Sequence, residues 1–296
     1  MAPLVSVGIP LYQSRRFLDT IIENIESIRY ADVEIIVSDR HLLDDTLAVL
    51  RERYRSDRRF RFLEARDEVD WVGNFNLLLA QSRGKYFVCM PHDDSFPPVF
   101  IEELVAALEA QPDAVFAFGR VDQLSVDGFL PTFPWTPPPI AGHDEWTIGS
   151  ALRLLTLWHL WMAYRGMVRR DVVEHDALYM RPSYQNIRAD VYWVFALSLR
   201  GRVSYVPSCW YTKRFYRSST GADWRFGVRQ SLNAFRVLRS YLNDFARSRR
   251  EALIGQVVVF FWSTVQGFLP ATIARRLGIV VRQTMLGGRW REVEPQ

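Results

Sequence analysis

The sequence predicts an α/β fold, a mostly parallel sheet with helices on both faces, followed by a helical C-terminal region. The chain has 296 residues, 49% of them apolar and 24% charged. That composition can bury a large core, and it excludes a disordered, collagen-like or small disulfide-bonded protein. Over residues 1–120, short apolar runs alternate with segments of helical periodicity, as in proteins built from strand–helix–strand units. The runs are continuous, which is typical of parallel strands buried on both faces.

The first expected strand covers residues 4–9 and ends at Pro10. Ser14 is a candidate N-cap for the helix that follows. The second strand covers residues 33–37 and stops before Asp39. The apolar residues expected on one face of the first helix are Phe17, Leu18, Ile21, Ile22, Ile25 and Ile28.

The same alternation continues along the chain. The expected elements are a helix over 44–55, a strand over 60–63, a helix over 72–81, a strand over 85–90, a helix over 97–109 and strands over 114–118 and 203–206. Residues 125–145 are a proline-rich loop, and 146–220 are rich in aromatic residues. The helical end of the chain, 225–296, is expected to bury one side composed of Leu232, Phe235, Leu238, Tyr241, Leu242 and Phe245.

Charge is distributed unevenly. Residues 1–150 carry a net charge of −10 and residues 151–296 a net charge of +14. A basic half can attract phosphates, nucleic acid or an anionic membrane. Nucleic acid is not expected as a partner, because the basic half contains no recognised nucleic-acid module and no regular basic stripe. The cations themselves are 35 arginines and two lysines, Lys85 and Lys213.

Polar residues follow two of the predicted strands. Asp39 ends the second strand, and His92, Asp93 and Asp94 follow the strand over 85–90. Open parallel sheets bind ligands at the carboxyl ends of their strands. Two adjacent carboxylates repel each other unless a cation joins them, and Mg²⁺ prefers carboxylates together with substrate phosphates. A cap on the helix that starts near Pro97 is the alternative role for the pair.

Several other kinds of site are excluded by missing motifs. There is no G-x-G-x-x-G after the first strand, no phosphate-binding loop with a lysine, and no G-x-S-x-G. Cys89 and Cys209 lack metal-ligand spacing. Two cysteines also favour a reducing compartment, and the N-terminus lacks the pattern of a secretory signal, so we expect a cytoplasmic protein.

A series of short motifs runs through residues 3–220. The series consists of V-S-V-G-I-P-L-Y at 5–12, E-I-I-V-S-D at 34–39, Asn76, Ala80, G-K-Y-F at 84–87, His92-Asp93-Asp94, Ala189-Asp190 and the stretch from Arg214 to Thr220. In this order and spacing the chain resembles the family 2 glycosyltransferases. The resemblance implies a GT-A-type, Rossmann-like sheet and inverting transfer of a sugar from a nucleotide-sugar donor.

The resemblance also implies roles for individual residues. Asp39 would bind the nucleobase, which suits uracil or thymine and hence a UDP- or dTDP-sugar. Asp93 would hold the ribose, and Asp93 and Asp94 a divalent cation, Mg²⁺ or Mn²⁺, on the diphosphate, with Asp94 the direct ligand. Asp190 would be the general base for the acceptor hydroxyl. The other residues expected to bind the nucleotide sugar are Pro10, Tyr12, Arg66, Asn76, Arg214 and Arg217.

By the same resemblance, residues 1–120 would bind the donor, 121–222 would bind the acceptor and supply the base, and 223–296 would form a C-terminal helical region. The acceptor could be a carbohydrate, a lipid-linked sugar or a small molecule. The sequence departs from the family pattern at Pro91, Arg40, Ala189 and Tyr216. Two alternatives therefore stay open. One is a non-catalytic carbohydrate-binding or assembly subunit with a decayed donor site, and the other is a sugar-phosphate nucleotidylyltransferase.

Residues 252–274 are uncharged and lie between Arg249-Arg250 and Arg275-Arg276. Length and flanks fit a membrane span, but internal polar residues and Pro270 argue against one. The remaining readings are an ordinary buried helix and a peripheral contact with the inner face of the membrane. His92 is expected to be a hydrogen-bonding neighbour, Trp193 to pack in the core or stack on a sugar, and a homo-oligomer stays open.

Overall fold

The computed structural model describes residues 3–39, 44–64, 69–128, 146–156, 160, 162–217 and 227–268. In these residues the strands are β1 (Val5–Leu11), β2 (Val33–Asp39), β3 (Phe60–Glu64), β4 (Tyr86–Cys89), β5 (Ala114–Ser125), β6 (Met167–Arg169) and β7 (Arg202–Phe215). The α-helices are α1 (Leu18–Ser27), α2 (Thr46–Arg53), α3 (Trp71–Gln81), α4 (Phe100–Ala110), α5 (Ile148–Thr156), α6 (Arg170–Asp176), α7 (Ala189–Arg200), α8 (Val228–Phe245) and α9 (Arg249–Phe268). Short 3-10 turns are η1 (Arg15–Phe17), η2 (Ala163–Arg165) and η3 (Tyr184–Asn186).

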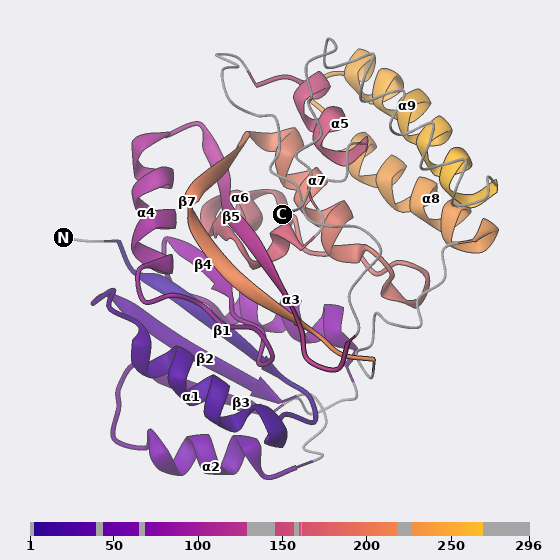
Figure 1. Cartoon of the computed structure of the whole chain (residues 1–296). Coiled ribbons are helices and arrows are strands. Elements are labelled where there is room, and N and C mark those ends of the chain that lie inside the picture. The colour runs from indigo at the N-terminus through magenta and orange to yellow at the C-terminus, as the bar shows by residue number, and fades with distance from the viewer. Residues whose placement is uncertain are drawn as a thin grey trace, which may run out of the picture.

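The strands of the described part form one sheet in the order β3-β2-β1-β4-β6-β5-β7 (Figure 1). β3, β2, β1 and β4 are mutually parallel, β6 is antiparallel to both of its neighbours, and β5 and β7 are parallel to each other. The predicted mostly parallel sheet is confirmed. β5 and β7 are longer than expected, because their outer halves pair from Arg120↔Trp210 to Ser125↔Phe215 although polar residues interrupt the apolar pattern there.

Two hydrophobic layers cover the two faces of the sheet. On one face, side chains of β1 pack against Ile21 and Ile25 of α1, Leu50 of α2 and Leu104 of α4. On the other face, alternate residues of the same sheet pack against α3, α5, α7 and α8. Figure 1 shows the second group of helices, with α9, gathered on one side of the molecule. Trp193 of α7 belongs to this second core and its Nε1 donates to the carbonyl of Leu178 at 2.8 Å, which confirms the packing role for this tryptophan.

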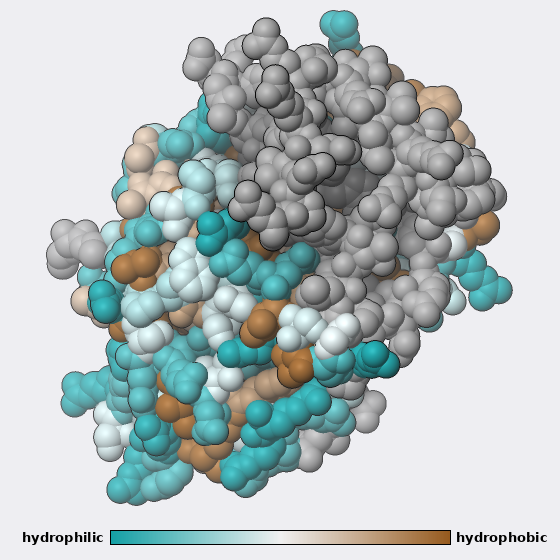
Figure 2. Space-filling view, in the orientation of Figure 1, coloured by the Kyte–Doolittle hydropathy of each residue, from teal (hydrophilic) through white to brown (hydrophobic). Residues whose placement is uncertain are grey.

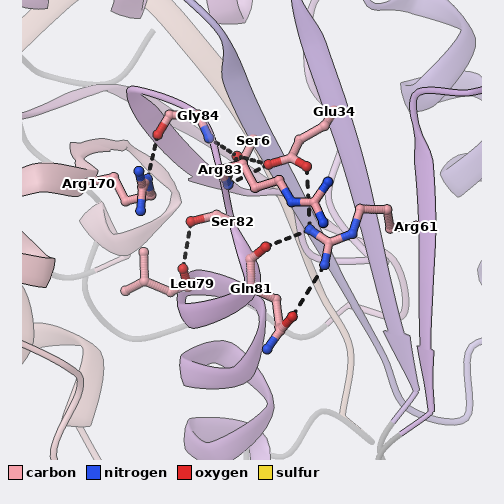
Figure 3. Close-up of polar contacts among 9 residues, drawn as sticks. All are labelled: Ser6, Glu34, Arg61, Leu79, Gln81, Ser82, Arg83, Gly84 and Arg170. Carbon is pink, nitrogen blue, oxygen red and sulfur yellow. Dashed lines mark hydrogen bonds and ion pairs between the residues drawn. The ribbon is translucent and has the colours of Figure 1, made fainter.

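A polar cluster lies at the end of the sheet where β1 and β2 begin (Figure 3). The buried Glu34 carboxylate accepts from Ser6 Oγ at 2.5 Å and from the backbone N–H of Arg83 at 2.6 Å. Arg61 Nη1 lies 3.5 Å from its other oxygen and donates to the Gln81 carbonyl at 2.6 Å. Protein groups therefore provide the hydrogen-bond and ion-pair partners of the buried Glu34 carboxylate, and the role of the cluster is structural.

The helices α8 and α9 pack side by side across a close contact at Gly255. A Cβ atom at Gly255 would lie 2.5 Å from Leu242 Cδ2, so a larger residue there would force the Leu242 side chain to shift. The inward face of α8 carries Ala234, Val237, Leu238, Tyr241, Leu242 and Phe245. Leu232 is exposed, so its predicted place on that face was wrong. The helical period that joins Leu238 to Leu242 and Phe245 passes through Ala234 and leaves Leu232 on the outside.

α9 is buried on one side only. Val259 and Ser263 face the core, whereas the large apolar residues Leu253, Ile254, Val257, Phe260 and Phe261 are exposed. The reading of this segment as an ordinary buried helix is therefore wrong for its outer face. In Figure 2, hydrophobic residues are visible at the upper right rim, where Figure 1 shows α9. Among the described helices, none is long and apolar enough to cross a bilayer.

The predicted boundary at 120 lies inside β5, and the one at 222 lies outside the described residues. β7 lies beside β5 in the same sheet, and one core contains residues of α3, α7 and α8. The assignment of 1–120, 121–222 and 223–296 to separate tasks stays a prediction.

Candidate active site

Several of the predicted donor residues lie at the carboxyl edge of β1, β2 and β4. β1 lies between the other two strands, and its last residue, Leu11, pairs with Asp39. Pro10 pairs with Ser38 one residue earlier, and Tyr12 follows directly. The backbone N–H of Met90 donates to the Gly8 carbonyl at 2.9 Å, so the segment after β4 emerges beside the end of β1.

The loop that carries Asp93 and Asp94 is fixed from two sides. Asn24 of α1 donates from Nδ2 to the Asp94 carbonyl at 2.8 Å and accepts from the Phe96 N–H at 3.1 Å. Ser95 and Thr212 of β7 exchange two backbone hydrogen bonds of 3.0 and 2.8 Å. The loop therefore holds the two carboxylates in a defined place between the first helix and the last strand.

Two cationic side chains pair with these carboxylates. Lys213 Nζ donates to Asp93 Oδ2 at 3.0 Å and lies 3.2 Å from Asp94 Oδ1, an ion pair without hydrogen-bond geometry. Arg165 Nε donates to Asp94 Oδ2. Burial by itself would raise the pKa of the Asp93 carboxyl, but the charges of Lys213, His92 and Arg165 hold that pKa well below its usual range.

Arg165 is a buried guanidinium at the end of η2, and sequence reasoning missed it. The residue after this turn, Gly166, lies so close to β5 that a Cβ atom there would be 2.3 Å from the Ala117 carbonyl oxygen. The Arg165 guanidinium lies over the Tyr164 ring, 4.5 Å from the centroid. Burial opposes its charge, yet Asp94 is the main cause that raises the pKa of Arg165 well above its ordinary value. No local pattern distinguishes this arginine from the other 34.

Asp190 lies half-buried in the first turn of α7, and the charge of Arg165 affects the pKa of its carboxyl. Burial raises the pKa of its carboxyl, and the charge of Arg165 is the largest opposing effect, followed by the backbone N–H groups of Val191 and Asp190. A carboxylate with a raised pKa is a stronger base than an exposed aspartate. Arg165 thus links the predicted base electrostatically to the Asp93-Asp94 loop.

His92 has the neighbour role that the sequence predicted. Its Nδ1 lies 2.5 Å from Ser14 Oγ, and its ring stacks on Phe17 at 4.8 Å. Burial lowers the pKa of His92. Ser14 occupies the predicted N-cap position, before the turn at Arg15–Phe17, but its side chain makes no capping bond there. Its Oγ instead accepts from the Tyr12 N–H and contacts His92.

Arg214 and Tyr216 reach the loop from the end of β7. Arg214 Nη1 donates to the Asp93 carbonyl at 3.4 Å, and Tyr216 Oη to the same oxygen at 3.3 Å. Arg16 extends over the Tyr216 ring, 5.4 Å from its centroid. Arg217 is exposed, and its backbone N–H donates to Asp127 Oδ2 at 2.8 Å.

Asn76 is engaged elsewhere. Its side chain donates to the Met180 carbonyl at 2.8 Å and accepts from the Met180 N–H at 3.0 Å. These bonds tie α3 to the segment that leads to α7, and a contact of Asn76 with the donor stays a prediction. Arg40, Arg66 and Thr220 of the sequence analysis lie outside the described residues.

A divalent cation does not fit the arrangement as it stands. Both carboxylate oxygens of Asp94 and one of Asp93 face cationic nitrogens. Within the described ranges, no group of three or more His, Cys, Asp or Glu side chains could hold a metal ion. The cation that the sequence resemblance implies would have to displace Lys213 to reach both aspartates.

Solved structures with the same fold define the class. TarS of S. aureus, residues 1–349 in complex with UDP-GlcNAc, superposes with a TM-score of 0.65 at 12% identity, over 95% of this chain and 77% of that one. The mannosyltransferase PcManGT of Pyrobaculum calidifontis, in complex with GDP-Man and Mn²⁺, gives 0.57 at 15% identity, over 95% and 81%. The likeness concerns the fold, which is of the GT-A type.

Sequence comparison then names the family. Residues 6–174, more than half of the chain, match Glycosyl transferase family 2, and the chain belongs to that family. An uncharacterized glycosyltransferase of Haemophilus influenzae is 32% identical over 125 residues, 42% of this chain and 38% of that protein. A GalNAc(5)-diNAcBac-PP-undecaprenol beta-1,3-glucosyltransferase of Campylobacter jejuni is 32% identical over 93 residues, 31% of this chain and 30% of that protein. The chain thus spans well under half the length of these relatives.

Proposed function

We propose that the protein is an inverting glycosyltransferase that moves a sugar from a UDP- or dTDP-sugar to an acceptor hydroxyl. The observation that carries the proposal is the convergence of Asp39, Asp93 and Asp94 at one sheet edge, with Asp190 linked to them through Arg165. Family membership supports the same reaction class. The nucleotide choice rests on Asp39, whose carboxylate can accept a hydrogen bond from the ring N–H of uracil or thymine.

The proposed reaction is a single displacement at the anomeric carbon. Asp190 takes the proton of the acceptor hydroxyl as that oxygen attacks, and its raised pKa suits this role. The bond between the anomeric carbon and the β-phosphate oxygen breaks, and its electron pair stays on the nucleoside diphosphate. Asp93 accepts a ribose hydroxyl hydrogen bond, and Arg214 lies close enough to the same loop to bind phosphate oxygens.

Dependence on Mg²⁺ or Mn²⁺ stays a prediction from the sequence resemblance. Mn²⁺ accompanies GDP-Man in the PcManGT structure, and that finding concerns that protein. In this chain the aspartates are already paired with Lys213 and Arg165, so the proposed reaction contains no step through a metal.

The outer face of α9 supports a lipid-linked acceptor. Leu253, Val257, Phe260 and Phe261 are exposed along it, and Arg249 and Arg250 lie at its start. An exposed apolar helix face flanked by arginines suits an anionic membrane surface. We propose peripheral attachment there, on the cytoplasmic side that the cysteine content predicts. The relative from Campylobacter jejuni is named for an undecaprenol-linked acceptor.

Thermal shift measurements with UDP, dTDP, GDP and ADP test the proposed function. A nucleotide at 100 times its Kd stabilises the protein by about 2.7 kcal/mol, so UDP or dTDP should raise Tm more than the purine nucleotides. Slow hydrolysis of the matching nucleotide sugar would separate a transferase from a non-catalytic carbohydrate-binding subunit. Preference for GDP would refute the nucleotide assignment, and no shift with any nucleotide would refute donor binding.

A further inference from the structure

We propose that Lys213, with Arg165 behind it, supplies the positive charge at the donor diphosphate that a divalent cation supplies in metal-dependent enzymes. The protein would then bind the nucleoside diphosphate without metal. This inference rests on the proposed function, since it assigns a charge source to the same donor site.

The first argument is position. Lys213 Nζ lies 3.0 Å from Asp93 Oδ2 and 3.2 Å from Asp94 Oδ1, so one positive charge bridges the two adjacent carboxylates. Arg165 neutralises the second oxygen of Asp94 from the buried side. Two cations therefore balance two carboxylates. The repulsion that led us to expect a metal ion is relieved by the chain itself.

The second argument is chemical type. Lysine carries a compact point charge, whereas the planar guanidinium of arginine matches one carboxylate at a time. The chain contains 35 arginines and only two lysines. One of the two lysines lies between the paired aspartates, where a compact cation is needed. The other, Lys85, is half exposed and pairs with Glu109 on the surface at 2.5 Å.

The third argument is access to the donor. The Lys213 side chain is 14% exposed, while that of Asp94 is completely buried. An ammonium group has three N–H donors, and in the described part of the chain Lys213 has two carboxylate oxygens as partners. Of these two contacts only the one to Asp93 Oδ2 has hydrogen-bond geometry, so at least one N–H can donate to a β-phosphate oxygen. Arg214, which reaches the same loop, adds a second cation on this side.

In the transfer step Lys213 would act on the leaving group. As the bond from the anomeric carbon to the β-phosphate oxygen breaks, negative charge grows on the diphosphate, and a fixed ammonium close to it stabilises that charge. Lys213 keeps its proton throughout. The acceptor proton goes to Asp190, so no other group has to exchange a proton in this step.

Titration calorimetry with UDP and dTDP as probes tests the proposal. The wild-type protein should bind the preferred nucleotide with the same Kd in EDTA and in Mn²⁺. Lys213→Ala should weaken binding in EDTA about 10-fold to 100-fold, the range for one hydrogen bond to a charged group. Mn²⁺ should restore part of that loss, because the variant frees the oxygens of Asp93 and Asp94. Lys85→Ala is the matched control and should bind as wild type does.

A second variant and a second readout cover the case in which Lys213→Ala does not fold. Lys213→Arg keeps the charge but not the compact shape, and it should still weaken nucleotide binding in EDTA. Mn²⁺ titrations followed by electron paramagnetic resonance should show no tight site in the wild type without nucleotide. Nucleotide binding by the wild type only with Mn²⁺ would overturn this inference and leave the proposed function intact. No binding under either condition would overturn both.

Discussion

Arg165 and Asp94 form an ion pair inside the protein, with side-chain exposures of 6% and 0%. They are 71 residues apart in the chain, and the pair joins the turn before β6 to the loop after β4. A charge pair removed from water in this way depends on both partners: without Asp94 the guanidinium loses its main counter-charge, and without Arg165 the Asp94 carboxylate keeps only Lys213, at 3.2 Å. The pair also sets the local electrostatics, since Arg165 lowers the pKa of Asp190 against the effect of burial.

Arg165→Met should therefore be strongly destabilising. Removing one partner of a buried ion pair costs about 3–5 kcal/mol, and urea unfolding monitored by circular dichroism would measure the loss. Arg51→Met is the matched control, because Arg51 pairs with Glu64 at 2.6 Å on the surface. That variant should lose no more than about 1 kcal/mol. Equal losses in the two variants would show that the buried pair of Arg165 with Asp94 contributes no more to the free energy of unfolding than a surface pair does.

Asp190→Asn should reduce kcat about 10²-fold or more while leaving Tm and nucleotide affinity close to wild type. The amide keeps the shape of the side chain but cannot accept the acceptor proton. Steady-state kinetics with calorimetry of the same sample would measure both. An unchanged kcat with a lower Tm would make Asp190 a helix-start residue, and the base would lie elsewhere.

The pH dependence of kcat should follow from the raised pKa of Asp190. A base acts only when it is deprotonated, so turnover should fall as pH decreases through that pKa. Because burial raises it, the acid limb should lie above the ordinary aspartate value of 3.8. Arg165→Gln removes the positive charge that lowers the pKa of Asp190, so the acid limb of this variant should lie at higher pH than in the wild type. Arg165→Lys keeps a positive charge and should shift the limb less. The pH–rate profile of each variant provides the check.

Asp39→Ala should weaken UDP binding by about 1.5–3 kcal/mol, the contribution of a hydrogen bond to a charged group. Arg51→Met, which changes a surface pair with Glu64, is the matched control and should bind UDP as wild type does. Unchanged UDP affinity in Asp39→Ala would place the nucleobase elsewhere.

Membrane attachment should depend on the outer face of α9. Phe260→Ser with Phe261→Ser should abolish flotation with anionic liposomes, and high salt should weaken wild-type flotation by screening the arginines. Leu232→Ser changes another exposed apolar residue, on α8, and serves as control. Flotation that survives both the double variant and high salt would contradict peripheral attachment through this face.

Much of the fold could be predicted because its signals are local. Buried parallel strands are continuous apolar runs, and helices repeat their apolar residues every three to four positions. Both patterns are visible in β2 and α3, whose observed bounds lie within two residues of the expected ones. The placement of Asp39 and of the Asp93-Asp94 loop at one edge of the sheet also follows, since parallel strands end at the same edge.

The sequence by itself determined the parallel α/β sheet, the edge at which the acids gather and the family motifs. The tertiary structure alone decided what surrounds those acids. Lys213 reaches Asp93 across 120 residues and Arg165 reaches Asp94 across 71, and no local pattern in the sequence pairs either residue with an acid. The Ser14 side chain binds Tyr12 and His92 instead of capping a helix, and Leu232 is exposed, against what their local patterns predicted. Local periodicity fixes which face of an element is apolar, but only the packing of distant elements brings one charge against another.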